Sequence, residues 1–248
     1  AMGEVYATTV SPHLGPDAAL GFAHGFAVAF GQIDPGEGRK CFLAAPKGQG
    51  DMLLAAHEAG GGVPGLLAVT GGSPPETWDL AAAYAKAVGC LAGGGFVTTF
   101  RRECISDQFG EQVVLCGGVI ELLKSAFDIL VEGGYGRENA YFECVHELKL
   151  ITDLLARHGV DGMRARISGT AAYGGLTRGP RVIDESVRAR MKGILAEIEN
   201  GDFAAEFLKR HEDTAGLAAD EAQGPLATEG RRVLPRLHPG DTNEGEPS

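Results

Sequence analysis

The hydrophobic pattern of the chain changes near residue 105, and this change constrains the fold more than any other feature. Before it, four short apolar runs bounded by Gly or Pro predict buried strands, and two segments with helical periodicity lie between them. Strands and helices that alternate in this way are typical of a parallel sheet covered by helices. After residue 105 the strand signals end and long helical periods follow. The sequence therefore predicts an α/β part over residues 1–104 and an all-α part after it.

Each part can be divided into expected elements. The α/β part has strands at Gly21–Val28, Cys41–Ala45, Gly65–Val69 and Phe96–Phe100, and helices at Asp51–Ala59 and Pro75–Val88. The helical part, residues 105–212, has helices at Asp107–Glu132, Glu138–His158, Asp184–Asn200 and Phe203–Glu212. Residues 213–248 are rich in Gly, Pro, Ala and acids, so we expect a partly disordered tail whose last ten residues are disordered. In this tail only Leu226–Leu237 is apolar enough to dock as a helix.

Composition and charge exclude several classes of protein. The chain has 33 acidic and 22 basic residues, a net charge of −11, and no run of basic residues longer than two, which argues against a nucleic-acid partner. It contains no apolar run of about 18 residues and no secretory leader pattern, so we expect no membrane association and a cytoplasmic location. Its five cysteines are odd in number and form no CxxC pair, which indicates neither a disulfide framework nor a zinc site.

Two predicted helices each carry a pair of acids four residues apart: Asp107 with Glu111, and Glu143 with Glu147. Like charges at this spacing share a helix face and repel by a few tenths of a kcal/mol. A solvated face is one explanation, although Leu150 continues the line of the second pair. Four gathered carboxylates would need roughly four positive charges, which two divalent cations supply, and hard oxygen ligands favour Mg²⁺ or Mn²⁺ over zinc. Spacing alone leaves the metal site and the solvated face equally open.

Three further residues are candidates for chemistry. His24 and Lys47 follow predicted strands, and ligands of open α/β sheets bind outside the carboxyl ends of strands, so both residues are expected at a crevice. A structural or merely exposed position is the plainer alternative for each. Cys116 lies in an apolar run and is most simply a small core residue.

Gly60, Gly62 and Gly65 formally match the dinucleotide fingerprint GxGxxG, but they follow a helix and lead into a strand. The fingerprint needs the opposite order, a strand before the glycines and a helix after them. The sequence therefore predicts no cofactor-binding residue.

Several motifs, taken together, resemble those of the ketol-acid reductoisomerase family in order and spacing from about Val5 to Leu208. They are Phe22-Ala23-His24-Gly25-Phe26, Phe30-Gly31-Gln32-Ile33, Ala45-Pro46-Lys47-Gly48, Asp107-Gln108-Phe109-Gly110-Glu111-Gln112, Leu115-Cys116-Gly117-Gly118 and Tyr141-Phe142-Glu143-Cys144-Val145-His146-Glu147-Leu148-Lys149-Leu150-Ile151. The resemblance implies a two-magnesium enzyme with a knotted helical domain, in branched-chain amino-acid biosynthesis. In that family a 2-aceto-2-hydroxy acid chelates the metals, undergoes an alkyl shift and is then reduced by NADPH.

Carried over by position, the resemblance implies a role for each candidate residue. Asp107 and Glu111 would ligate metal from one subunit, and Glu143 and Glu147 would complete the site from the other subunit of a homodimer. Glu147, Lys47 and His24 would be catalytic, with a carboxylate moving the proton. Ser168 and Cys116 would bind the substrate.

The chain also departs from the family's pattern. Family members begin with a nucleotide-binding half whose GxGxxG loop holds NADPH, whereas this chain resembles the family only from the last helix of that half onward. We therefore expect a truncated Rossmann-like sheet, followed by the knotted helical domain, without its own NADPH site. Gly169 and Ala172 stand where the family usually has a polar or acidic residue, Leu54 and Ala55 replace an Arg pair, and Ala27 replaces an Asn. These departures bear on the choice of substrate.

Three functions follow from these observations. The first is a Mg²⁺-dependent enzyme that isomerises a 2-oxo or 2-hydroxy acid by an alkyl shift, or performs a related enolate or alkoxide step. The second is one piece of a split or truncated NADPH-dependent reductoisomerase, in which NADPH comes with a partner chain. The third is a non-catalytic relic that binds ligand without turnover.

Overall fold

The computed structural model describes residues 2–238 and divides into two compact units, Ala1–Phe109 and Gly110–Ser248. The predicted disorder of the last ten residues, 239–248, lies outside the described residues. None of the described helices is both long enough and apolar enough to cross a membrane.

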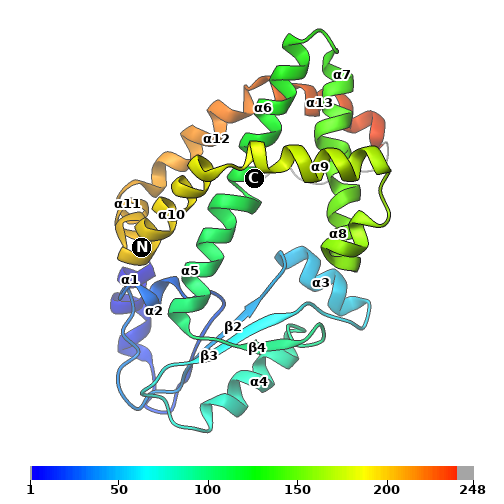
Figure 1. Ribbon diagram of the computed structural model, residues 1–248. Coiled ribbons are helices and arrows are strands. Elements are labelled where there is room, and N and C mark those ends of the chain that lie inside the picture. The colour runs from blue at the N-terminus through cyan, green and yellow to red at the C-terminus, as the bar shows by residue number, and fades with distance from the viewer. Residues whose placement is uncertain (1, 239–248) are drawn as a thin grey trace. The chain divides into compact units, whose positions relative to one another are not determined.

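The first unit is built on a small four-stranded sheet, with strands in the order β1-β2-β3-β4 (Figure 1). The strands are Leu20–Phe22, Cys41–Pro46, Gly65–Val69 and Gly95–Val97. The expected truncated Rossmann-like sheet is confirmed, but it is only mostly parallel, because β2 and β3 run antiparallel.

The antiparallel pair arises from the connection between β2 and β3. Pro46, the last residue of β2, pairs with Gly65, the first residue of β3, and the amide of Lys47 donates to the carbonyl of Pro64 at 2.8 Å. The chain therefore returns along the strand that it has just left. Helix α3, Gly50–Glu58, lies within this return instead of crossing over the sheet to a parallel partner.

Both faces of the central strands are buried. Phe42 and Ala44 face a cluster that includes Ala81 and Ala85 of α4, Thr77–Ala87, which packs on β2 and β3. Leu43 belongs to a second cluster, which includes the start of α5, because successive strand residues point to opposite faces. This double burial is why β2 appears in the sequence as an uninterrupted apolar run.

The structure corrects two of the predicted strands. β1 stops at Phe22, and a bend over residues 23–25 followed by helix α2, Phe26–Ala29, replaces the rest of the strand that we predicted as Gly21–Val28. β4 ends at Val97, and Phe100 begins helix α5, Phe100–Gly110. β4 is also an exposed edge strand and not a buried one, since Val97 is 75% exposed. Before the sheet, residues 2–13 are helical, in α1 (Met2–Val5), η1 (Tyr6–Val10) and η2 (Ser11–His13).

The described part of the second unit is helical throughout, as expected. Its elements are η3 (Glu111–Leu115), α6 (Gly118–Glu132), α7 (Arg137–Tyr141), η4 (Phe142–His146), α8 (Glu147–Arg164), α9 (Gly169–Val182), α10 (Glu185–Asn200), α11 (Asp202–Arg210), η5 (His211–Asp213), α12 (Thr214–Ala222) and α13 (Pro225–Leu237). Helix α13 lies where Leu226–Leu237 was expected to dock. Helices α9 and α12 were not predicted, because α9 contains four glycines and Pro180, and α12 is short and lacks a clear apolar stripe.

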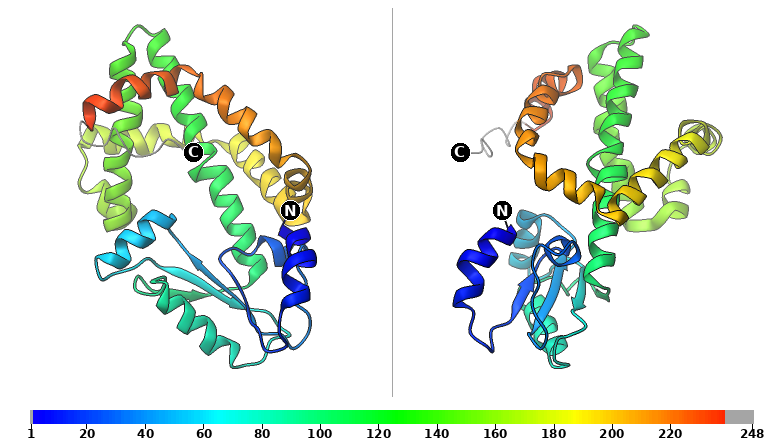
Figure 2. Two further views of the ribbon diagram at one scale, coloured as in Figure 1. Left: turned by 180° about the vertical axis from the view of Figure 1, so that it is seen from behind. Right: turned by 90° about the vertical axis from the view of Figure 1, so that its left-hand side faces the viewer.

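The core of the second unit lies where α6, α7 and α13 meet. It contains Phe127, Ala140, Tyr141 and Val233, all at most 6% exposed. The right-hand view of Figure 2 shows α13 and α9 on opposite sides of α6. Helix α9 presents large apolar side chains to solvent, including Tyr173 and Leu176, which are 66% and 63% exposed.

The predicted helix Asp107–Glu132 is interrupted between η3 and α6. η3 is a wide, π-helical turn, and the amides of Cys116 and Gly117 both donate to the carbonyl of Glu111. A Cβ at Gly117 or Gly118 would lie 2.1 or 1.9 Å from a carbonyl oxygen of the preceding turn. These glycines are therefore required by the turn itself.

Candidate functional site

Glu103 is the buried centre of a polar cluster in the first unit. It is 1% exposed and lies on α5, four residues before Asp107, so the two carboxylates share one helix face. Its Oε2 accepts the backbone N–H of Gly25 at 2.8 Å, and its Oε1 accepts Lys47 Nζ at 3.0 Å. A buried carboxylate is tolerated only when it is paired in this way.

Lys47 links the two carboxylates of α5. Its Nζ lies 3.0 Å from Glu103 Oε1 and 2.6 Å from Asp107 Oδ1. Burial lowers the pKa of Lys47, but the hydrogen bonds to Asp107 and Glu103 outweigh this effect and raise the pKa above its usual value. Lys47 is therefore held as an ammonium ion at the end of β2.

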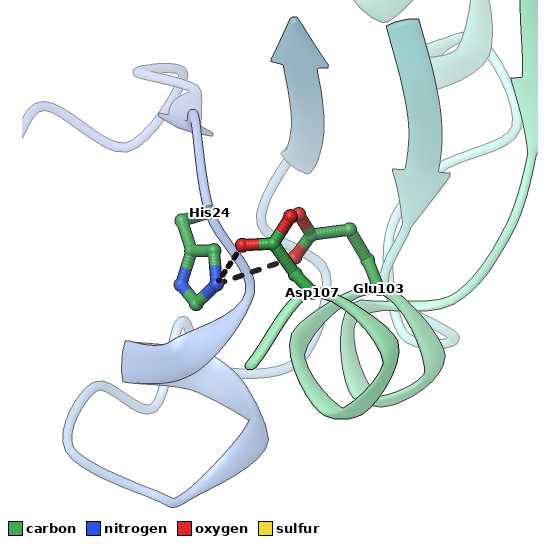
Figure 3. A group of neighbouring side chains, drawn as sticks. All are labelled: His24, Glu103 and Asp107. Atoms are coloured by element: carbon green, nitrogen blue, oxygen red, sulfur yellow. Dashed lines mark ion pairs between the residues drawn. The ribbon is translucent and has the colours of Figure 1, made fainter. Parts of the chain in front are cut away.

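His24 approaches the same carboxylates from the turn after β1, as Figure 3 shows. Its Nδ1 accepts the backbone N–H of Phe26 at 3.2 Å, and its Nε2 lies 3.3 Å from Asp107 Oδ2 and 4.0 Å from Glu103 Oε2. Because Nδ1 is an acceptor, Nε2 carries the proton in the neutral ring, on the side that faces Asp107. Asp107 is thus held at one oxygen by Lys47 and at the other by His24.

The cluster carries more negative than positive charge. Two carboxylates face one ammonium, and the imidazole adds no charge when it is neutral. Within the described part of either unit, His24, Glu103 and Asp107 form the one group of three potential ligand atoms within 4.8 Å of one another. The buried thiol of Cys104 responds to the same surroundings, because burial and then the charges of Glu103 and Asp107 raise its pKa to about 12. The cluster favours a cation and disfavours a further anion.

Comparison with known proteins decides the family. The model of the ketol-acid reductoisomerase C-terminal domain matches residues 100–234, more than half of the chain. The chain belongs to the ketol-acid reductoisomerase family. A solved NADH-preferring ketol-acid reductoisomerase from an uncultured archean is 38% identical, with a TM-score of 0.89 over 94% of this chain and 72% of that one. The family comprises oxidoreductases of branched-chain amino-acid biosynthesis.

Two more distant structures share the fold alone. A protein from Jannaschia sp. CCS1 is 15% identical, with a TM-score of 0.56, and covers 80% of this chain and 72% of that one. A semialdehyde dehydrogenase NAD-binding protein from Cupriavidus necator, in complex with calcium and NAD, is 18% identical, with a TM-score of 0.54, and covers 80% of this chain and 74% of that one.

The first unit also matches a family model. The NADPH-binding domain of acetohydroxy acid isomeroreductase matches residues 1–94. The expectation that the chain lacks the nucleotide-binding half of a reductoisomerase is therefore partly wrong. The four-stranded sheet belongs to that half, although its sequence contains no GxGxxG loop between a strand and a helix.

The other residues carried over from the family lie in the second unit. Glu111 begins η3, Glu143 lies in η4 and Glu147 begins α8, and all three are exposed. Glu111 and Glu143 thus both lie in π-helical turns, which occur frequently at functional sites. Across residues 2–238, no hydrogen bond or ion pair engages these three carboxylate groups.

The two predicted substrate-binding residues have different surroundings. Ser168 is the N-cap of α9: its Oγ accepts the N–H of Ala171 at 3.2 Å and lies 3.0 Å from Thr170 Oγ1. Cys116 is exposed, so its interpretation as a core residue is wrong. The reason is that η3 turns one side chain, Val113, into the protein and leaves Val114 through Cys116 in solvent.

Glu103 is the residue that sequence reasoning missed. Its signal was the same spacing of four that singled out Asp107 and Glu111, extended by one turn toward the N-terminus. Its burial could not be foreseen, because it depends on the amide of Gly25, 78 positions away.

Proposed function

We propose that this chain is a Mg²⁺-dependent member of the family that isomerises a 2-aceto-2-hydroxy acid by an alkyl shift. The observation that carries the proposal is the convergence of Lys47 and His24 on Asp107, anchored by buried Glu103, at positions that match the family's motifs. In this reaction an alkyl group migrates from the carbon that bears the hydroxyl to the adjacent carbonyl carbon. The hydroxyl loses its proton and becomes a ketone, while the former carbonyl oxygen gains a proton.

The donor set fits a hard divalent cation. Asp107, Glu111, Glu143 and Glu147 would hold two Mg²⁺ ions, for which Mn²⁺ can substitute, because all four offer carboxylate oxygens. The last three are exposed, and no described cation neutralises them. When bound, Mg²⁺ would supply Lewis acidity to the substrate carbonyl.

Protein side chains would do the remaining work. Lys47 and the Nε2–H of His24 hold the two oxygens of Asp107 and so fix its orientation. Glu147 would take the hydroxyl proton and return it to the new alkoxide, since a carboxylate can serve as base and then as acid. Ser168 would hold the substrate carboxylate through its hydroxyl, and Cys116 would line the same site.

We further propose that the site is completed in a homodimer with knotted helical domains. The support is the exposed apolar side chains of the second unit: Leu150 lies on α8, three residues after Glu147, and is 55% exposed, and α9 exposes Tyr173 and Leu176. Burial of such exposed apolar side chains favours association with a partner subunit. Light scattering tests this part directly, and a clean monomer would contradict the shared site.

The decisive experiment combines binding and turnover. The chain is incubated with Mg²⁺ and a 2-aceto-2-hydroxy acid without NADPH, the isomer is detected by NMR, and metal binding is measured by calorimetry. Glu143→Gln should lose both signals, whereas Glu197→Gln, which alters an exposed acid on α10, should lose neither. The proposal fails if the wild-type chain neither binds metal nor forms the isomer.

A second candidate is an NADPH-dependent reductoisomerase whose GxGxxG segment is supplied by a partner chain. The match of residues 1–94 to the NADPH-binding domain model favours it. It predicts that a small NADPH-binding protein co-purifies from the native source, and that adding it makes NADPH oxidation depend on the 2-aceto-2-hydroxy acid. Isomer formed by the isolated chain, with no such partner, would favour the first function.

A further inference from the structure

Ion pairs around Glu138 join α13 to α7. Arg232 Nη2 lies 2.9 Å from Glu138 Oε1, and Arg236 Nη1 lies 2.8 Å from the same oxygen. Arg232 also pairs, at 2.5 Å, with Glu229 of its own helix, whose carboxylate is almost completely buried. Arg232 therefore links a buried acid of α13 to an acid of α7, and the two guanidinium groups lower the pKa of Glu138.

Helix α7 continues directly into η4 and then into α8, so whatever holds α7 also holds the start of the segment with Glu143 and Glu147. Tyr141, the last residue of α7, is buried against α13, where a Cβ at Gly230 would lie 3.4 Å from its ring. Val145 of η4 packs on the same core cluster.

The packing of Val145 sets the direction of both carboxylates. Residues two positions apart on a helix point to nearly opposite sides. Glu143 and Glu147 are each two positions from Val145, so they point away from the α13 side, and both are exposed. A rotation of η4 relative to α13 would therefore move both carboxylates together.

The apolar packing around Val145 leaves an unfilled groove on its α13 side. This groove of about 460 Å³ lies between α13 and η4, lined by Val145, Leu226 and Leu234, with Ile120 of α6. The contacts that hold α13 to α7 beside this groove include the packing of Val233 in the core cluster, the Tyr141 ring at Gly230 and the ion pairs to Glu138.

We propose that Glu138, Arg232 and Arg236 are positioning residues, which hold η4 in the orientation that presents Glu143 and Glu147 to a divalent cation. This inference rests on the proposed function, because it takes these two carboxylates as metal ligands. It assigns Arg232 and Arg236 of α13, at least 85 positions further along the chain, a role in metal affinity.

The test measures Mn²⁺ binding to the full chain by electron paramagnetic resonance, without substrate. Glu138→Gln keeps the side-chain shape and removes the charge on which both arginines converge. We expect it to weaken Mn²⁺ affinity about five-fold, the scale of an exposed ion-pair contribution. Hydrogen exchange of the amides of residues 142–147 should become faster in the same variant. Arg236→Gln should weaken Mn²⁺ binding as well, and Arg236→Lys should largely restore it.

The control is Arg188→Gln, which breaks an exposed pair with Glu185 on α10. It should leave Mn²⁺ affinity and exchange in residues 142–147 unchanged. Arg232 is not the primary target, because its loss leaves Glu229 buried and unpaired and threatens folding.

The outcomes separate the two proposals. If Glu143→Gln abolishes Mn²⁺ binding while Glu138→Gln binds like the wild type, the positioning role is wrong and the metal site stands. The positioning role is also wrong if Arg188→Gln weakens binding as much as Glu138→Gln does. If the wild-type chain binds no Mn²⁺, the metal site fails and this inference fails with it.

Discussion

Removing the ammonium of Lys47 should destabilise the first unit, because Lys47 neutralises a buried acid. Glu103 is 1% exposed and lies 3.0 Å from Lys47 Nζ. Loss of one partner of a buried ion pair costs about 3–5 kcal/mol. Lys47 is itself 34% exposed, and the N–H of Gly25 still serves Glu103, so we expect Lys47→Met to lower the free energy of unfolding by about 2–3 kcal/mol.

A double-mutant cycle isolates this electrostatic contribution. Glu103→Gln keeps an acceptor for Gly25 and leaves Lys47 paired with Asp107, so it should cost about 1–2 kcal/mol. In the double variant no uncompensated charge remains buried. The loss of unfolding free energy in the double variant should therefore be smaller, by about 1–2 kcal/mol, than the sum of the losses in the two single variants.

Trp78 makes the measurement specific to this unit. It is the single tryptophan of the chain and lies in α4, which packs on the sheet, so its fluorescence follows unfolding of the first unit in urea. The reasoning would be refuted if the two substitutions were additive within about 0.5 kcal/mol, the usual behaviour of independent sites.

Three further predictions concern the pH dependence of the Lys47 pair and substitutions at glycines. Folding raises the pKa of Lys47 above 10.5, so the contribution of Lys47 to stability is complete below pH 10.5 and is lost as the pH rises through the folded pKa. In urea titrations, the difference in unfolding free energy between wild type and Lys47→Met should therefore shrink only above pH 10.5. Gly25→Ala should lower the free energy of unfolding by at least about 2 kcal/mol in the same assay, because the new Cβ would lie 2.2 Å from the carbonyl oxygen of Phe100. Gly110→Ala has open space around its Cβ and should instead stabilise its helix by about 1 kcal/mol. Gly118→Ala should lower the melting temperature measured by circular dichroism, because its Cβ would lie 1.9 Å from a carbonyl oxygen of η3; an unchanged melting temperature would show that the wide turn tolerates a side chain.

Local patterns predicted much of the secondary structure. The strand Gly65–Val69 was predicted with the bounds that the structure shows, and Cys41–Ala45 falls one residue short of β2. Both are short apolar runs between turn residues, and their burial on both faces makes that signal strong. β1 and β4 are shorter than predicted, because helices begin at Phe26 and Phe100, where the apolar runs continue.

The candidate site was predicted only in part. The sequence indicated His24, Lys47 and Asp107 separately, and the structure brings these three together. It could not indicate that Glu103, an acid beside two arginines, is buried. Its burial requires that the turn after β1 approach α5, a contact that no local pattern encodes.

The sequence by itself determined the family, the change from α/β to helical structure near residue 105, and the acids available for a metal. These depend on residue type and on spacing within a few turns. The tertiary structure alone decided that β2 and β3 run antiparallel, that Glu103 anchors the cluster, and that α13 packs on the helix leading to Glu143. The physical reason is the same in each case: these features arise from contacts between segments distant in the sequence, whose energies depend on which surfaces meet and exclude water.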